Sequence, residues 1–289
     1  MRSAFVATLL AKAVVRLTQE NLSYYDNVLE ISRTRFSVGD IAQIDLDRLE
    51  LQRVQDESDA QSAEVNLRTA KIQLLTLLND RTPVEQFDVA GLFDFNDQLM
   101  PQDEFRKMAL DTRPDLKAAA EAVDKAQTEH KLAIANGSTD PMLSAWYTHN
   151  SSNNNPFGIN TLGVSASIPP RVFDRNQGDK LRTQLDIGRN GKLTGAVQAL
   201  VFSDVDSAYA VVNSNRLRLQ PYKTKYLEQA VRVRDTVAFS YQHGGASLVD
   251  FLNAQSEYRS VELSYLNLIG SYLTAAAQLN LAVGREVMQ

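Results

Sequence analysis

The sequence predicts a mainly α-helical fold with a small β part, in which two long helical hairpins are related by duplication. Three observations support this prediction. The first 82 residues contain no proline and a single glycine, Gly39. The segment around Gly39 recurs near Gly244, 205 residues later. Residues 159–170 instead alternate between apolar and small polar side chains, which is typical of a strand.

Composition limits the classes of function. The chain has 289 residues, of which 44% are hydrophobic and 22% charged, so it has enough apolar side chains for a folded core. A net charge of −5 argues against a nucleic-acid partner. There is no cysteine, which excludes disulfides, thiolate metal sites and cysteine nucleophiles. No run of 18 apolar residues occurs, so no membrane-spanning helix is predicted.

The first residues, "MRSAFVATLLAKA", allow two interpretations. A positive start, a short apolar stretch and Ala11-Lys12-Ala13 imitate a signal peptide, although the stretch is shorter than usual. Alternatively, Ser3 opens a helix, as Ser207 does later in the chain.

The internal repeat aligns Gly39 with Gly244 and Asp45 with Asp250 at an offset of 205. At the same offset, "TAKIQL" from Thr69 falls on "TAAAQL" from Thr274. Near the N-terminus the offset is 204, because Ala4 falls on Ala208. One residue was therefore gained or lost between these points, and each copy is predicted to be a helix, a glycine turn and a second helix.

The first copy covers 1–79 and the second 171–289. Residues Gln43 to Leu78 are rich in good helix formers, and Asn79 and Gly284 are placed to end helices in the left-handed conformation. The helix predicted over about 177–241 contains Pro221 and three glycines, at 188, 191 and 195. These residues should weaken or bend it, so no single straight rod is expected.

Two segments lie between the first copy and the strands. Residues 80–113 form an irregular connector with one short helix near 102–111. A helix follows over 114–136, because Pro114 suits the first helical position and Asn136-Gly137 suits the end.

A strand hairpin is predicted within 141–170, on either side of the polar loop "NSSNNNPFG". Each strand is about as long as a tilted membrane-spanning strand. Trp146, Tyr147 and Phe157 are candidates for aromatic residues at the membrane interface. The alternative is an ordinary hairpin on a soluble domain. Since a lone hairpin is not independently stable, its strands need partners.

Several segments, in this order, resemble the TolC-type outer membrane efflux family. They are "RPDLKAAAEAVDKAQ", "GVSASIPPRVFDRNQGDK" and "YQHGGASLVDFLNAQ", and the second is similar to the heavy-metal and cation efflux branch. The resemblance covers essentially the whole chain. It implies a homotrimer in which the helices form an α-barrel tunnel across the periplasm and the strands join a shared β-barrel in outer-membrane lipid.

The resemblance also implies partners and a missing part. The tunnel tip would meet a periplasmic adaptor protein bound to an inner-membrane pump, for which the RND type is one candidate. This sequence begins inside the helix of the first repeat, so we expect an N-terminally truncated chain that lacks its first strand pair.

The resemblance places the candidate site residues at the two turns. Asp250, Asp45 and Asn253 would lie at the tunnel constriction, where a ring of carboxylates favours cations. The alternative is that both aspartates only cap their helices. The adaptor contact would be made by the following turn residues: Val38, Gly39, His243, Gly244 and Gly245.

No enzymatic activity, cofactor or metal site is predicted. The sequence has no nucleophile–base constellation, phosphate-binding loop or HExxH motif, and His130 and His149 lack ligand spacing. The leading hypothesis is a passive outer-membrane exit duct of a tripartite efflux system. The alternative is a soluble periplasmic coiled-coil scaffold or adaptor without a channel. Metal cations and small organic compounds both remain open as substrates.

Overall fold

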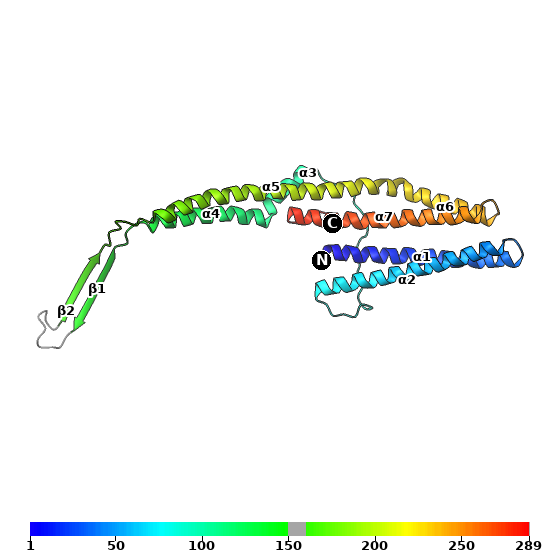
Figure 1. Cartoon of the computed structure of the whole chain (residues 1–289), viewed down its shortest axis with the longest axis horizontal. Helices are drawn as coiled ribbons and strands as arrows, with labels where there is room; N and C mark the ends of the chain where they lie inside the picture. The colour runs from blue at the N-terminus through cyan, green and yellow to red at the C-terminus, as the bar shows by residue number, and fades with distance from the viewer. Residues whose placement is uncertain (150–159, 289) are drawn as a thin grey trace. The chain divides into compact units, whose positions relative to one another are not determined.

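The computed structural model describes residues 1–149 and 160–288, so Phe157 and the rest of the predicted polar loop lie outside the described residues. The chain forms two compact units, 1–112 with 203–289, and 113–202. Figure 1 shows the elements along the chain. They are α1 (Arg2–Ser37), α2 (Gln43–Leu78), α3 (Gln102–Thr112), α4 (Pro114–Ala135), β1 (Met142–His149), β2 (Asn160–Ser167), α5 (Gln177–Pro221), the π-helical turn η1 (Tyr222–Tyr226), α6 (Leu227–Gln242) and α7 (Leu248–Val283).

The first hairpin consists of α1 and α2. The helix predicted over Gln43–Leu78 is confirmed as α2. Asn79 ends it in the left-handed conformation, with φ 53°, and Gly284 ends α7 in the same way, with φ 83°. In both cases the backbone N–H of the left-handed residue returns to carbonyls of the last turn, which satisfies groups that a helix end otherwise leaves unpaired.

The second hairpin contains the extra residue that the change of offset implies. The α-helical pattern of α5 continues through Gly188, Gly191 and Gly195, so these glycines do not interrupt it. The irregularity follows Pro221, where the π-helical turn η1 begins. A π-helical turn takes up more residues than an α-helical one, whereas α1 is α-helical throughout. We place the one-residue difference between the repeats at η1.

Helices of the first unit form a layer in the order α2, α1, α7 and α6 (Figure 1). Near the turns the core joins both hairpins, with Tyr25 edge-on to Phe251 and Phe251 stacked on Tyr241 at 5.0 Å between ring centroids. Leu46 and Leu49 of α2 complete this cluster. Burial of these large side chains holds the hairpins together near the turns.

The connector between α2 and α4 is anchored at several points. Phe95 packs edge-on against Tyr272, and Val89 packs against Leu9 and Leu74. The short helix predicted near 102–111 is confirmed as α3. From α3, the guanidinium of Arg106 binds Asp206 of α5 through two hydrogen bonds, of 2.6 and 2.7 Å. This bidentate geometry fixes the connector to the second hairpin.

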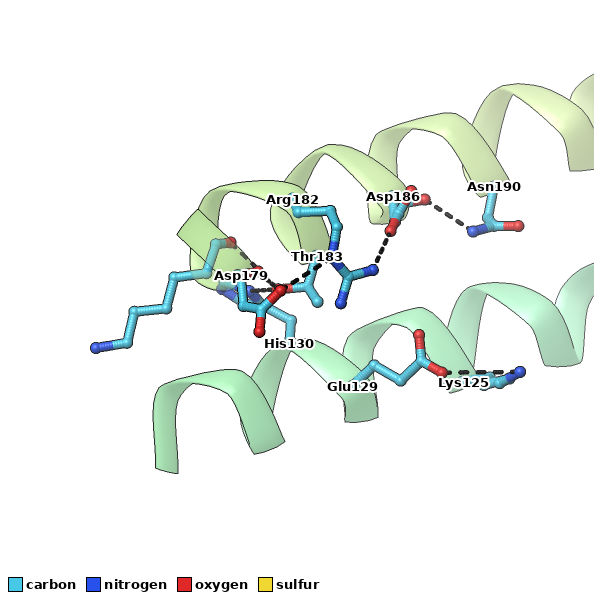
Figure 2. A network of polar contacts seen from close by, with 9 residues as sticks. Lys125, Glu129, His130, Asp179, Arg182, Thr183, Asp186 and Asn190 are labelled. Atoms are coloured by element: carbon cyan, nitrogen blue, oxygen red, sulfur yellow. Dashed lines mark hydrogen bonds and ion pairs between the residues drawn. The ribbon is translucent and has the colours of Figure 1, made fainter. Parts of the chain in front are cut away.

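In the second unit, α4 pairs with the first half of α5. The helix prediction with Pro114 at its start is confirmed. Figure 2 shows the polar contacts of this pair. His130 lies 2.9 Å from the buried hydroxyl of Thr183, which itself donates to the carbonyl oxygen of Asp179.

The hairpin of β1 and β2 has two chemically distinct faces. The antiparallel register pairs Tyr147 with Leu162 and Trp146 with Gly163. One face carries the following mostly apolar residues: Leu143, Ala145, Tyr147, Leu162, Val164 and Ala166. The other carries Trp146 and Met142 together with small residues such as Ser144, Gly163 and Ser165, and the predicted alternation of β2 is confirmed. The two candidate interfacial aromatics of β1 therefore project to opposite faces.

The predicted mainly α-helical fold with a small β part is confirmed. Among the described residues, no helix is both long and apolar enough to span a membrane.

Candidate functional site

The two turns of the first unit have the same backbone geometry. Gly39 and Gly244 both have left-handed φ, of 79° and 75°. At each turn the glycine N–H donates three residues back, and the next N–H donates five residues back: Gly39 to Phe36, Asp40 to Arg35, Gly244 to Tyr241 and Gly245 to Ser240. The four bonds match at the offset of 205, and this helix-ending motif needs a residue that tolerates positive φ.

The other predicted turn residues are exposed. Val38 is 77% exposed, and His243 is exposed with its ring 4.1 Å from that of Phe239. Nδ1 of His243 lies 2.8 Å from the carbonyl oxygen of Phe239. In each turn an exposed side chain, Val38 or His243, stands beside glycine, so that a partner backbone can approach closely.

Arg35 connects the two turns. Its guanidinium contacts Asp40 at 2.6 Å and donates to the carbonyl oxygen of Tyr241 at 3.3 Å. It also lies 5.4 Å from the centroid of the Tyr241 ring. Burial raises the pKa of Tyr241, and the charge of Arg35 opposes that shift. The turns are thus coupled by charge-assisted and cation–π contacts.

Asp250 has the helix-capping contacts that the alternative interpretation requires. Oδ2 of Asp250 accepts from the backbone N–H of Ser247 at 3.2 Å and contacts its hydroxyl at 2.7 Å, while the Asp250 N–H donates to that hydroxyl at 3.1 Å. This is a capping box. The hydrogen bonds from the side chain and backbone of Ser247 lower the pKa of Asp250. The carboxylate is exposed, so capping does not prevent it from facing a channel.

Asp45 holds the equivalent position without the cap. Ala42 precedes α2 where Ser247 precedes α7, and it has no side-chain oxygen to offer. Asp45 is half-buried, and its charge acts on the pKa of Tyr241. The two aspartates are equivalent in sequence but differ in their surroundings.

A polar stripe runs along α7 from Asp250. It follows alternating steps of three and four residues, and none of its members is buried or positively charged. The members are Asp250, Asn253, Glu257, Ser260, Ser264, Asn267, Ser271, Thr274 and Gln278. These steps keep side chains on one face of a helix over about 42 Å. Two of the three predicted constriction residues, Asp250 and Asn253, therefore begin a much longer polar surface.

The same stripe occurs on α2 at the offset of 205. Its members are Asp45, Arg48, Gln52, Gln55, Asp59, Ser62, Asn66, Thr69 and Gln73, and again none is buried. Arg48 is its one cation. An ordinary solvated helix face usually carries lysines and glutamates, whereas these two stripes consist mainly of uncharged amides and hydroxyls.

Both stripes border grooves whose floor is α1. A cavity of about 470 Å³ has Asp59 and Ser62 of α2 on one side, Ser260 of α7 on the other, and Leu17 and Asn21 of α1 between them. A second cavity, of about 420 Å³, lies farther along α1 and is lined by Asn267, Ser271, Thr274 and Gln278 of α7. The stripes therefore face the same side of the helical layer.

A buried ion pair lies at the first cavity. Arg259 of α7 donates to Oδ1 of Asp56, which is 2% exposed and belongs to α2. Burial raises the pKa of Asp56, while the charge of Arg259 opposes that shift. The guanidinium also lies 5.9 Å from the centroid of the Tyr25 ring. Three helices thus converge on a pair that the sequence did not reveal.

The histidines are dispersed. His130 contacts Thr183 and His149 contacts Asn160 at 2.6 Å. Within residues 1–149 and 160–288, no group of three or more histidine, cysteine or acidic side chains is placed to hold a metal ion.

Comparison with known proteins identifies the family. Residues 106–285, more than half of the chain, match the family described as outer membrane efflux protein. The chain belongs to the outer membrane efflux protein family. This confirms the resemblance stated above. The family is one of outer-membrane transport proteins and not of enzymes, as the resemblance implied.

Two curated relatives of this outer membrane efflux protein align along almost all of it. The cobalt-zinc-cadmium resistance protein CzcC of Cupriavidus metallidurans is 21% identical over 285 residues, which cover 98% of this chain and 66% of CzcC. Nodulation protein T of Rhizobium leguminosarum bv. trifolii is 23% identical over 300 residues, covering 98% of this chain and 62% of that protein. The chain thus spans about two thirds of the length of these relatives.

Solved structures share the fold. The channel CusC superposes with a TM-score of 0.76 at 18% identity, covering 98% of this chain and 67% of CusC. The open state of the MtrE outer membrane channel of Neisseria gonorrhoeae superposes with a TM-score of 0.74 at 19% identity, covering 99% of this chain and 65% of MtrE. The helical hairpins and the strand hairpin of this efflux protein therefore have the same fold as in these solved structures.

Sequence reasoning missed the partner of Asp250 and the length of both stripes. The capping role of Ser247 could have been predicted, because a serine followed three residues later by an acidic residue at a helix start is a capping-box pattern. The stripes were also detectable, because their three-and-four spacing is visible in the sequence.

Proposed function

We propose that this chain forms part of a passive exit duct in the outer membrane, through which a tripartite efflux system releases its substrate. The observation that carries the proposal is the pair of polar stripes on α2 and α7. They lie at repeat-equivalent positions, face the same side of the layer and contain almost no fixed positive charge. Membership of the outer membrane efflux protein family supports this proposal.

The stripes have the chemistry of a water-filled wall. Amides and hydroxyls hold water without binding an ion tightly, which suits a path that a substrate must both enter and leave. The α7 stripe carries carboxylates at Asp250 and Glu257 and no cation, so it favours positively charged substrates. The likeness to a protein named for cobalt, zinc and cadmium resistance points the same way. We therefore favour metal cations over organic compounds.

At the turns, we propose that Asp250 forms a ring of carboxylates in a homotrimer, with Asn253 one turn farther in and Asp45 nearby. The capping box with Ser247 then holds each carboxylate in a fixed position, because two of its contacts use the same oxygen. The exposed turn residues Val38 and His243 and the glycines beside them would contact a periplasmic adaptor protein that joins the duct to an inner-membrane pump.

For the strand hairpin, we propose insertion into a shared β-barrel. Its apolar face is strongly exposed in the single chain, since Leu143, Leu162 and Val164 are 75–77% exposed. Lipid would cover such a face. Fluorescent labels on Leu162 and Val164 should be shielded by lipid, while a label on Ser165 of the other face should stay open to water. Labels at Leu162 that are fully open to water would support the soluble scaffold instead.

The duct is tested by single-channel recording with cysteine variants. Asn267→Cys and Ser271→Cys on the α7 stripe should react with a positively charged thiol reagent and lose conductance. Ser23→Cys is the control, because Ser23 is exposed and lies two residues, or nearly half a turn, from Asn21 in the groove floor. Equal effects at Ser23 and Ser271, or no effect at either stripe position, would show that α7 does not line the path.

A further inference from the structure

The cavity between α1, α2 and α7 carries an excess of negative charge. Within the described part of the chain, the charged residues that line it are Asp56 and Asp59 of α2 and Arg259 of α7. Two carboxylates share one guanidinium, so one negative charge in the cavity is left without a cation. This excess distinguishes the cavity from an ordinary gap between helices.

The buried carboxylate of Asp56 is only half paired. Its Oδ1 accepts from Arg259 and, at 3.4 Å, from the side-chain amide of Gln52. Its Oδ2 is buried and has no hydrogen-bond partner among the described residues. A buried polar atom without a partner costs free energy, and the cost is larger for a charged group. A further positive group close to Asp56 would therefore be stabilising.

Asp59 is the accessible carboxylate of the cavity. It is exposed and accepts from the amide of Gln55 at 2.9 Å, and none of the ion pairs of residues 1–149 and 160–288 includes it. Asp56 and Asp59 are three residues apart, so their side chains lie on one face of α2. Burial raises the pKa of Asp56, Arg259 opposes that rise, and the charge of Asp59 adds to it. A cation beside Asp59 would relieve this repulsion.

The rest of the lining suits a small organic molecule. The volume of about 470 Å³ lies within the range of small-molecule sites. Leu17 and Ala63 are buried and give the cavity an apolar base. The polar uncharged lining residues are Thr18, Asn21, Ser62, Asn66, Ser256 and Ser260. A bare metal ion prefers a full set of oxygen or nitrogen ligands and gains nothing from an apolar base.

The second cavity along α1 shows what this one adds. Its volume is similar, about 420 Å³, and the polar residues that line it in the described structure are all uncharged. They are Asn215, Asn267, Ser271, Thr274 and Gln278. Charge, rather than size, therefore separates the two cavities.

We infer that the cavity between α1, α2 and α7 binds a small organic cation, namely a protonated amine with an apolar body. The ammonium group pairs with Asp59 beside the buried Asp56, and the apolar body lies against Leu17 and Ala63. This ligand class differs from the metal cations favoured for transport. Since the cavity borders the polar stripes, a bound amine would narrow the proposed path, and only this consequence rests on the proposed function.

Tryptamine and tryptophol are a matched pair of probes, because both carry an indole ring on an ethyl chain that ends in an ammonium group or a hydroxyl. Titration calorimetry of the purified chain should give tryptamine a dissociation constant about tenfold lower than that of tryptophol, since hydrogen bonds between charged groups are the stronger ones. Equal affinities would mean an apolar pocket that does not recognise charge, and would overturn the inference. Absence of tryptamine binding would overturn it too.

The carboxylate is tested by Asp59→Asn, which should weaken tryptamine binding about tenfold and leave tryptophol binding unchanged. Asp47→Asn is the matched control, because Asp47 is exposed on α2 and accepts from the amide of Gln43, four residues earlier. Asp59 has the same contact with Gln55, but Asp47 does not line the cavity. Equal weakening in both variants would assign the effect to overall charge and contradict the site.

Ser260→Phe tests the position of the site, because Ser260 is exposed and lines the cavity. The added ring should abolish binding of both probes, whereas Ser23→Phe on the exposed side of α1 should not. Full binding in Ser260→Phe would place the amine elsewhere. Single-channel recording separates the site from the duct: tryptamine that binds without changing the current would leave the site standing and count against the path, while a conducting chain that does not bind tryptamine would remove the site alone.

Discussion

Arg35 of the first hairpin donates to the backbone carbonyl of Tyr241 in the second, across 206 positions of the chain. The same guanidinium lies over the Tyr241 ring and pairs with Asp40. It is mostly buried, with 19% of its side chain exposed. The two turns are therefore held to each other by one side chain that contacts a helix end, an aromatic ring and a carboxylate.

Arg35→Ala should destabilise the contact between hairpins by about 1.5–3 kcal/mol, because hydrogen bonds from a charged donor contribute that much. Arg33→Ala is the matched control. Arg33 pairs with Glu50 inside the first hairpin and is 60% exposed, so its loss should cost under about 1 kcal/mol. Denaturant unfolding of both variants measures the difference, and equal losses would argue against a role for Arg35 in joining the turns.

The capping box predicts opposite changes in stability for one substitution in each repeat. Ser247→Ala should destabilise α7 by about 1 kcal/mol, because it removes the cap of the first turn. Ala42→Ser should stabilise α2 by a similar amount, since Asp45 already occupies the position that would complete the box. Thermal unfolding tests both variants, and a stabilising Ser247→Ala would contradict the capping geometry.

Ser247→Ala should also change the titration of Asp250. The native pKa of this carboxyl is lowered, so the stability that it contributes is present above its unfolded pKa and is lost as pH falls through the native value. In Ser247→Ala the pKa of Asp250 should rise toward the ordinary value for aspartate. The stability that the protein loses when Asp250 is protonated at acidic pH should then be smaller. An NMR titration of the Asp250 carboxyl reports the shift.

Substitution by alanine should destabilise the protein at the two turn glycines and stabilise it at a glycine within a helix. Gly39→Ala and Gly244→Ala should each cost about 1–2 kcal/mol, because both need left-handed φ, although an added Cβ would meet nothing within 4 Å. Gly191→Ala in α5 should instead stabilise by up to about 1 kcal/mol, since its Cβ also meets nothing and alanine favours the helix. Circular dichroism melting distinguishes the two signs.

Asp250→Ala should raise single-channel conductance or reduce block by cations, if the exposed carboxylates form a ring at the constriction. Glu257→Ala is the control on the same stripe, two turns farther along α7, where we expect a smaller effect. Because Asp250→Ala also removes half of the capping box, Ser247→Ala serves as a second control that loses the cap but keeps the charge. Unchanged conductance in Asp250→Ala would remove its gating role.

The sequence was sufficient for the parts of the fold that depend on local chemistry. Proline, glycine and capping residues placed α2, α4 and the turns, and the alternation of residues 159–170 placed β2. Contacts between distant residues were not predictable in the same way. Arg35 with Tyr241 and Asp56 with Arg259 are 206 and 203 positions apart, and such pairs depend on which helix faces meet. The change of offset from 204 to 205 showed only that the extra residue lies between Ala208 and Gly244. A single inserted residue leaves no other mark in the sequence, so its position could not be narrowed further.

The π-helical turn supports a final prediction. Deleting Thr224 from η1 should convert α5, η1 and α6 into one regular helix that lacks the residue by which the second repeat exceeds the first, and the faces on both sides should keep their phase. The cost should be small, because Thr224 is exposed.

Deleting the exposed Ser23 from α1 is the control. In a regular α-helix, that deletion rotates every later residue by about 100°, which would turn the buried Tyr25, Val28 and Leu29 out of the core and cost several kcal/mol. Unfolding by denaturant should therefore separate the two deletions clearly. Equal destabilisation would mean that the π-helical turn is needed for more than accommodating an inserted residue.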